Sequence, residues 1–335
     1  MPQSINTHPA HDKVGLYIPE NPSPVIAVGG EDRKSFLQGI LSQDIVRPED
    51  GSLLFTFFLN PKARILFEAW AAIFPTEILL FPPPGTREEF IAHLKKYLFF
   101  RTKATIEDRS GQFRELRLMG PEAVTTLLPV LLPSETPHPV RSIREGGFAL
   151  LRPPVFQMDA YVGPAVDMFV PVNHFDSIRD TVRGRVLQTG GIELDRQAYE
   201  TYQTEKGIPE FPSELNENHF PAEVGLDTLG VSYNKGCYVG QEPVTRLKFQ
   251  GHLNRRLSGF VLDGEPEYAG TVPQPILNPE DGNEAGLLTR YCYSPAMGRT
   301  IGIGFLRKAH WEIDPDRELV LADGRRIRVT PLPFV

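Results

Sequence analysis

The segment Lys235-Gly236-Cys237-Tyr238-Val239-Gly240-Gln241-Glu242 is the most distinctive stretch of this 335-residue chain. The residues before it, Val231-Ser232-Tyr233, have the character of a strand, and the two glycines inside it permit tight backbone turns. Pro243 suits the first turn of a helix, where its missing N–H costs nothing, and Val244–Phe249 can continue that helix. We therefore predict a strand–turn–helix junction with Cys237 in the turn.

Cys237 lies where a thiol can become reactive. The positive end of the predicted helix, together with Lys235 and Arg246, would lower the pKa of the thiol and favour the thiolate. The alternative is an inert, small core residue, which is how most unpaired cysteines behave. Arg246 also has two interpretations, because it can pair with Glu242 at i, i+4 or reach a ligand carboxylate. The local spacing leaves both questions open.

Beyond residue 250 the chain consists of short strand-like runs with no helical pattern between them. Asp323-Gly324 is a strong hairpin signal, because both turn positions need residues that tolerate positive φ. A small all-β unit avoids exposed strand edges by closing into a barrel, so we predict a C-terminal β-barrel over residues 251–335. Its predicted strands are Leu257–Leu262, Gly286–Tyr293, Thr300–Leu306, Glu318–Ala322 and Arg326–Pro331.

Residues 1–250 mix helical and strand-like patterns without a regular βαβ rhythm, which predicts an α+β body with mainly antiparallel sheets. Helices are predicted over Asp32–Ile45, after the capping box at Thr86–Glu89, from Asp176 and over Glu122–Leu128. Strand-like runs rich in β-branched and aromatic residues lie between them: Val25–Val28, Leu53–Leu59, Arg64–Phe74, Glu77–Phe81, Phe113–Leu118, Phe148–Arg152 and Asp167–Val170.

The composition excludes several classes of protein. Hydrophobic residues make up 41% of the chain and charged residues 23%, which is typical of a globular protein with a sizeable core. A net charge of -7 argues against a broad nucleic-acid footprint. Two cysteines are too few for a disulfide framework, a Cys-only zinc site or a cluster held within one chain, so we expect no resident metal. The apolar region Ile65–Phe81 is too charged to span a bilayer, and the N-terminus lacks a targeting pattern, so we expect a cytoplasmic protein without membrane contact.

The distinctive segment resembles the signature of the YgfZ-type folate-binding proteins. These are relatives of the glycine-cleavage T-protein that act in iron–sulfur cluster maintenance and tRNA thiomodification. Other stretches agree in order and spacing, and the resemblance covers roughly residues 25–329. They are Phe36-Leu37-Gln38-Gly39, Leu59-Asn60-Pro61-Lys62-Ala63-Arg64-Ile65-Leu66, Gly207-Ile208-Pro209 and Tyr293-Ser294-Pro295. The resemblance implies a three-lobed ring, in which two α+β lobes and the barrel surround a channel for tetrahydrofolate.

The resemblance also implies which residues hold the folate. Glu205, in Gln203-Thr204-Glu205-Lys206-Gly207, stands where T-protein relatives carry the glutamate that holds the pterin, although Gln203 replaces the usual arginine. The alternative for Glu205 is a solvated carboxylate at a helix end. The further cofactor-binding candidates belong to the signature and the helix after it: Lys235, Tyr238, Gly240, Gln241, Glu242 and Arg246.

Each of the remaining candidates also has an interpretation without function. Lys235 could be a surface lysine lying over the turn, and Tyr238 could simply be packed. Arg255 and Arg256 are expected to form a solvated charge run, and Cys292 to be a structural residue of the barrel.

The T-protein uses an acidic pair to handle the aminomethyl group. The matching stretch here is Ala63-Arg64-Ile65-Leu66-Phe67-Glu68, so Phe67 replaces one acid while Glu68 remains. A phenyl ring gives no electrostatic help to a developing cation, which argues against ordinary aminomethyl transfer.

Three hypotheses follow. The first is a folate-binding accessory protein for iron–sulfur cluster assembly or repair and iron–sulfur-dependent tRNA modification, with Cys237 as its reactive thiol and iron–sulfur enzymes as clients. The second is a tetrahydrofolate-dependent aminomethyltransferase or demethylase. The third is a folate-free thiol scaffold.

Overall fold

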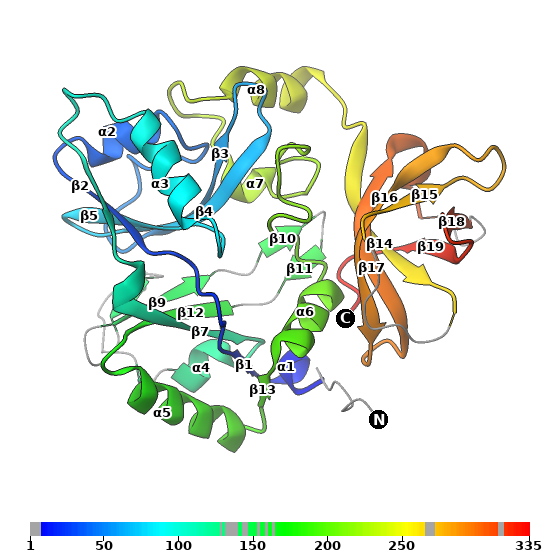
Figure 1. The fold of residues 1–335 in the computed structure, drawn as a ribbon, viewed down its shortest axis with the longest axis horizontal. Helices are drawn as coiled ribbons and strands as arrows, with labels where there is room; N and C mark the ends of the chain where they lie inside the picture. The colour runs from blue at the N-terminus through cyan, green and yellow to red at the C-terminus, as the bar shows by residue number, and fades with distance from the viewer. Residues whose placement is uncertain are drawn as a thin grey trace.

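The computed structural model describes residues 8–127, 129–130, 140–142, 147–152, 155–157, 160–162, 165–264, 272–313 and 318–335. These residues form two α+β lobes and a closed β-barrel, with α6 lying between the second lobe and the barrel (Figure 1). The fold class inferred from the sequence, α+β sheets followed by a C-terminal barrel, is confirmed. Among the described residues no helix is long and apolar enough to cross a membrane.

The first lobe is a five-stranded antiparallel sheet in the order β3-β4-β5-β2-β6. One face packs against the helices, where Phe58 and Phe67 meet Phe90 of α3 nearly edge-on. The bounds are β2 (Ile26–Gly29), α2 (Arg33–Gln38), β3 (Leu53–Leu59), β4 (Ile65–Ile73), β5 (Glu77–Phe81), α3 (Arg87–Lys96) and β6 (Thr105–Asp108).

The second lobe is a six-stranded sheet in the order β13-β1-β7-β12-β9-β8, in which only β1 and β13 pair in parallel. Its helices α4 and α5 bury an apolar face that includes Leu127, Phe175 and Val182. The bounds are α1 (His8–Asp12), β1 (Gly15–Tyr17), η1 (Ser110–Gln112), β7 (Phe113–Met119), α4 (Ala123–Leu127), β8 (Val140–Ser142), β9 (Phe148–Arg152), β12 (Ala165–Pro171), α5 (Phe175–Gln188) and β13 (Ile192–Leu194). A separate hairpin joins β10 (Val155–Gln157) and β11 (Ala160–Val162).

Three helices, α6 (Arg196–Glu205), α7 (Asp227–Gly230) and α8 (Gln241–Gln250), lead from the second lobe towards the barrel. The barrel closes in the order β14-β17-β16-β15-β18-β19, around a core that includes Phe260, Leu288 and Ile327. Its elements are β14 (Arg255–Leu262), β15 (Gln274–Leu277), β16 (Glu284–Ser294), β17 (Arg299–Arg307), η3 (Lys308–His310), β18 (Leu319–Leu321) and β19 (Arg326–Thr330).

Some local predictions differ from the structure. The helix predicted over Asp32–Ile45 ends at Gln38, because Ser42 leaves the helix and donates its backbone N–H to Phe57 of β3 at 2.9 Å. Val231–Tyr233 forms no strand, although the N–H of Ser232 bonds the Ser42 carbonyl at 2.9 Å.

Two helix starts can be compared with their predictions. Helix α8 begins at Gln241, after Gly240, with Pro243 in its first turn as predicted. Thr86 does precede α3, but its hydroxyl donates to the Pro83 carbonyl at 2.7 Å instead of capping the helix.

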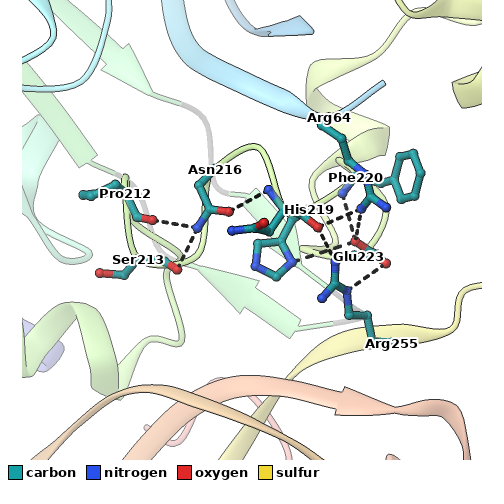
Figure 2. A network of polar contacts seen from close by, with 9 residues as sticks. Arg64, Pro212, Ser213, Asn216, His219, Phe220, Glu223 and Arg255 are labelled. Carbon is teal, nitrogen blue, oxygen red and sulfur yellow. Dashed lines mark hydrogen bonds and ion pairs between the residues drawn. The ribbon is translucent and has the colours of Figure 1, made fainter. Parts of the chain in front are cut away.

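The body and the barrel are joined by ion pairs around one buried carboxylate (Figure 2). Glu223 accepts a hydrogen bond from the backbone N–H of Phe220 at 2.9 Å and pairs with Arg64 at 3.3 Å and Arg255 at 3.1 Å. Arg64 follows the turn before β4, whereas Arg255 begins β14 of the barrel. The His219 ring stacks on Phe305 of β17, with 3.7 Å between ring centroids. Glu223 therefore ties the first lobe and the barrel to the same connecting loop.

Candidate functional site

A cavity of about 450 Å³ lies between the two lobes, a volume in the range of small-molecule sites. Its walls come from β1, β4, β7, α6 and the loop at residues 208–215. Aromatic side chains make up much of the lining: Tyr17, Phe55, Trp70, Phe81, Tyr199 and Phe211. Such walls suit a flat, partly apolar ring system.

Glu68 is the carboxyl group of the cavity that has a buried oxygen without a partner. It lies on β4 two residues before Trp70, so the strand alternation turns both side chains into the cavity. Its Oε2 is buried and has no hydrogen-bond partner among the described residues. Burial raises the pKa of Glu68 to about 8, and the negative charge of Glu210 adds to the rise. At neutral pH this group is therefore mainly a neutral acid, able to donate and to accept a hydrogen bond.

Phe67 points to the opposite face of β4, into the core under α3, where it contacts Phe90 and His93. The substitution of an acid by Phe67 therefore removes no carboxylate from the cavity. The sequence-based argument against one-carbon transfer loses its basis here, because the cavity-facing acid of the pair is the one retained, Glu68.

A closed polar network shapes the wall formed by β7 and α6. Arg117 pairs with Asp167 at 2.7 Å and with Glu115 at 2.7 Å, and it donates to the Tyr199 hydroxyl at 2.5 Å. Gln203 donates to the same hydroxyl at 2.5 Å. The Tyr199 ring is thereby held flat against Tyr17, with 4.0 Å between centroids and 8° between planes. Gln203, which replaces the usual arginine of the family pattern, thus helps to fix an aromatic wall.

Glu205 lies outside the cavity lining, at the junction of α1, α6 and the barrel. Its side chain is fully buried, so the alternative of a solvated helix-end carboxylate is wrong. Its Oε2 lies 2.6 Å from His11 Nε2, and its Oε1 accepts a hydrogen bond from the Ser294 hydroxyl at 2.6 Å. The His11 ring stacks on Tyr202, which does line the cavity. The assignment of Glu205 to the pterin stays a prediction, whereas Glu68 is among the carboxyl groups that line the cavity.

Lys235 is buried and holds the signature against the first lobe. Its Nζ donates to the Leu41 carbonyl at 2.7 Å and to the Gln43 carbonyl at 3.0 Å, and lies 4.8 Å from the centre of the Tyr238 ring. Burial lowers its pKa to about 8. The alternative of a surface lysine is therefore wrong, and Lys235 does not line the cavity either.

Tyr238 and Gly240 pack the signature onto β3 and the turn before β4. Tyr238 is buried in the core that includes Leu59 and Ala63, and burial raises its pKa to about 12. Gly240 has φ of +84°, and a Cβ added there would lie 2.7 Å from the Asn60 carbonyl oxygen. The turn therefore requires glycine at this position.

Cys237 is exposed in the turn before α8, which lies at the top of Figure 1. Gln241 Nε2 donates to the Lys235 carbonyl at 3.4 Å, which closes this turn. Arg246 pairs with Glu242 at 2.8 Å and both side chains are exposed, as the i, i+4 alternative predicted. Cys237, Gln241, Glu242 and Arg246 do not line the cavity, and their assignment to a ligand stays a prediction.

The structure also tests the predictions for three residues of the barrel. Cys292 is buried in β16 and burial raises its pKa to about 12, as expected of a structural thiol. Arg255 and Arg256 do not form a solvated charge run: Arg255 pairs with Glu223 at 3.1 Å, and Arg256 donates to the Trp311 carbonyl at 2.8 Å. Among the described residues no cluster of three or more His, Cys, Asp or Glu could hold a metal ion.

Two family models match the chain. The GCVT N-terminal domain matches residues 21–235, and the glycine cleavage T-protein C-terminal barrel domain matches residues 255–335. The chain therefore belongs to the glycine cleavage T-protein family.

Three named proteins have sequences similar to this chain. The aminomethyltransferase of Caldanaerobacter subterraneus is 23% identical over 95% of this chain and 83% of its own length. The iron–sulfur cluster assembly factor IBA57 homolog of Neurospora crassa is 27% identical over 75% of this chain and 53% of its own length. A chloroplastic protein of Arabidopsis thaliana is 28% identical over 84% of this chain. The match covers 63% of the length of that protein.

The crystal structure of glycine cleavage system aminomethyltransferase T from Bartonella henselae has the same fold. It superposes with a TM-score of 0.81 at 18% identity, covering 98% of this chain and 88% of that chain. The likeness supports the arrangement of two lobes and a barrel.

Glu68 was named from the sequence, but its place in the cavity and several other lining residues were not. Trp70 and Glu68 share a strand face, and the period of two along Ile65–Ile73 could have indicated this. Arg117, Tyr199 and Glu210 come from three different segments, and no local pattern brings them together.

Proposed function

We propose that this protein binds tetrahydrofolate in the cavity between its two lobes. The observation that carries the proposal is the buried, unpartnered Oε2 of Glu68 inside an aromatic-walled cavity of about 450 Å³. A pterin edge carries several N–H donors and acceptors, which a mainly neutral Glu68 can match from either side. Tyr17, Trp70 and Tyr199 supply flat apolar surfaces for the rings. When bound, a reduced folate supplies one-carbon carrier chemistry.

Calorimetric titration with tetrahydrofolate tests this proposal. We expect one-site binding by the wild-type protein, weakened about tenfold or more in Glu68→Gln, because an amide cannot ionise and its nitrogen cannot accept a hydrogen bond. Glu242→Gln, which changes an exposed glutamate outside the cavity lining, is the matched control and should bind as wild type. A Glu205→Ala variant tests the family-based assignment separately. Absence of binding by the wild-type protein would leave the folate-free scaffold as the better description.

The finer role that we propose is that of an accessory protein for iron–sulfur cluster assembly or repair, including iron–sulfur enzymes that modify tRNA. Two things support it: the exposed Cys237 in a signature turn held rigidly by Lys235, and the likeness to an iron–sulfur cluster assembly factor. The proposal assumes a reducing compartment such as the cytoplasm, where both thiols stay unpaired.

The test of this role is genetic rescue with matched cysteine variants. In a strain lacking the protein, Cys237→Ser should fail to restore the activity of iron–sulfur enzymes. Cys292→Ser should restore it, because Cys292 is buried in the barrel and its thiol has no access to clients. Full rescue by Cys237→Ser would rule out a role for the thiol.

Tetrahydrofolate-dependent transfer of a one-carbon group is the second candidate function, and the position of Glu68 favours it. A carboxyl that titrates near neutrality inside a cavity can take or give a proton at an amine. The purified protein should then convert an N-methyl or aminomethyl donor in the presence of tetrahydrofolate, and Glu68→Gln should abolish the turnover. No product above the level of the variant would exclude this function for the donors tried.

A further inference from the structure

Arg290 extends from the barrel into the loop that forms one wall of the cavity. Its Nη2 donates to the Ile208 carbonyl at 2.5 Å and lies 3.3 Å from Glu214 Oε2, while its Nη1 lies 3.0 Å from Glu210 Oε2. The Arg290 side chain is only 14% exposed and that of Glu214 is fully buried. One guanidinium group thus holds three points of the segment from Ile208 to Glu214.

The backbone of β16 explains how a barrel residue reaches this loop. The register between β16 and β17 shifts between Leu288 and Arg290, so Thr289 has no direct partner in the ladder. An irregularity of this kind re-aims the side chains that follow it. Arg290 is therefore directed out of the barrel and towards the body.

The segment that Arg290 holds includes Ile208, Pro209, Glu210 and Phe211, all of which line the cavity. Glu210 is the important member, because its carboxylate is ion-paired to Arg290 and its negative charge acts on Glu68. Arg290 of β16 is thus ion-paired to the carboxylate whose charge acts on Glu68.

Other charged or titratable groups also line the cavity, and most of them are ion-paired or are phenols. Arg117 is balanced by Glu115 and Asp167, and Arg196 pairs with Glu200 at 2.8 Å. The ionisable side chains that line the cavity together with Glu68 come from β1 and the residues after it, β7, α6 and the loop. They are Tyr17, Glu20, Glu115, Arg117, Arg196, Tyr199, Glu200, Tyr202 and Glu210. Of these, Glu210 acts on the charge of Glu68.

We propose that Arg290 is a positioning residue, which fixes the 208–214 segment as a wall of the cavity and, by holding the Glu210 carboxylate, sets the charge that Glu68 faces. The inference deepens the proposed function and rests on it, because Glu68 matters to a ligand only if the cavity binds one. The coupling itself is a property of the protein without ligand.

Trp70 provides a direct readout that needs no ligand. The chain has two tryptophans, so a Trp311→Phe background leaves Trp70, which shares the cavity face of β4 with Glu68. Its fluorescence should change with a midpoint near pH 8, and Glu68→Gln should remove that transition. In the same background, Arg290→Gln should raise the midpoint by about half to one pH unit, because the Glu210 charge is no longer balanced. Glu210→Gln should lower it by a similar amount.

A double-mutant cycle separates positioning from a general loosening of the barrel. In the Glu210→Gln background, Arg290→Gln should no longer shift the midpoint, because it acts through Glu210. Arg255→Gln is the matched control: it removes another arginine that joins barrel and body, but its partner Glu223 lies outside the cavity lining. The proposal is overturned if folded Arg290→Gln leaves the midpoint unchanged, or if its shift is the same without Glu210.

A second variant covers the case in which Arg290→Gln does not fold, since it leaves Glu214 buried without a counter-charge. Arg290→Gln combined with Glu214→Gln removes that buried charge and should still raise the midpoint; an unchanged midpoint overturns the proposal. Tetrahydrofolate titration is run separately on the wild-type protein. A shifted midpoint without folate binding would leave the coupling standing and remove the proposed function, whereas binding without a shift would do the reverse.

Discussion

Phe67 and Glu68 are neighbours on β4, and their side chains lie on opposite faces of the first sheet. The Phe67 ring meets Phe90 of α3 with 5.4 Å between centroids, whereas Glu68 lines the cavity with an unpartnered oxygen. A one-residue slip of the strand would exchange the two faces. The alternation of β4 therefore decides that the cavity keeps an acid even though its neighbour in the sequence is a phenylalanine.

The stability of the protein should depend on pH through Glu68. Its pKa is about 8 in the folded protein, against about 4.3 for glutamate in an unfolded chain. The unfolded chain releases the proton first, so Glu68 weakens the fold increasingly as pH rises from about 4 to 8. Glu68→Gln removes this cost. We expect it to stabilise the protein by about 1 to 3 kcal/mol at pH 8.5 and to have little effect at pH 4.5.

Urea unfolding of both proteins at the two pH values measures this difference. Glu242→Gln serves as the control, because that glutamate is exposed and should show no such pH dependence. A Glu68→Gln effect that is the same at both pH values would contradict the burial argument.

The two cysteines should differ sharply in reactivity. Cys237 is exposed, whereas Cys292 is buried in β16 with a raised pKa of about 12. Iodoacetamide should therefore modify Cys237 in the native protein and Cys292 only after denaturation. Mass spectrometry of the two tryptic peptides provides the measurement. Rapid native modification of Cys292 would show that the barrel opens readily at β16.

Sequence reasoning was most successful where the signal is local. The hairpin residues Asp323-Gly324 and the evenly spaced short strands predicted the barrel, because a turn chemistry and a period of two need no distant partner. The end of α2 was misplaced, because a distant contact, the one between Ser42 and Phe57, decides it.

The candidate site was predicted less well for the same physical reason. The signature is contiguous, and it is prominent in the sequence, but the structure uses Lys235, Tyr238 and Gly240 to pack a turn. The cavity is assembled from side chains far apart along the chain, such as Tyr17, Glu68 and Tyr199. Only tertiary packing brings these residues together, so a single sequence does not reveal that they share one cavity.

Two glycines of the signature should respond differently to alanine. Gly240 has a positive φ and a Cβ there would meet the Asn60 carbonyl at 2.7 Å, whereas a Cβ at Gly236 meets nothing within 4 Å. Gly240→Ala should destabilise the protein by about 1 to 3 kcal/mol, and Gly236→Ala by about 0.5 kcal/mol or less. Thermal unfolding of the pair tests this. Equal losses would mean that the turn is not held as tightly as its contacts indicate.

Glu223 should be one of the residues on which the attachment of the barrel depends. Its buried carboxylate pairs with Arg64 and Arg255 and accepts the Phe220 N–H, so one side chain joins three segments (Figure 2). Glu223→Gln keeps the shape but removes the charge that both arginines face. Breaking charge-assisted bonds of this kind costs about 1 to 3 kcal/mol, and we expect the free energy of unfolding to fall by that amount.

The matched control for Glu223 is again Glu242→Gln, which breaks an exposed pair with Arg246 at a similar distance. Exposed pairs contribute little, so this variant should lose about 0.5 kcal/mol or less. Urea unfolding of both variants at pH 7 gives the comparison. Because His219 stacks on the barrel beside this carboxylate, a mobile barrel should also leave that ring more open to solvent. Faster hydrogen exchange in the loop around His219 of Glu223→Gln, with no change in Glu242→Gln, would locate the loss at the junction between body and barrel.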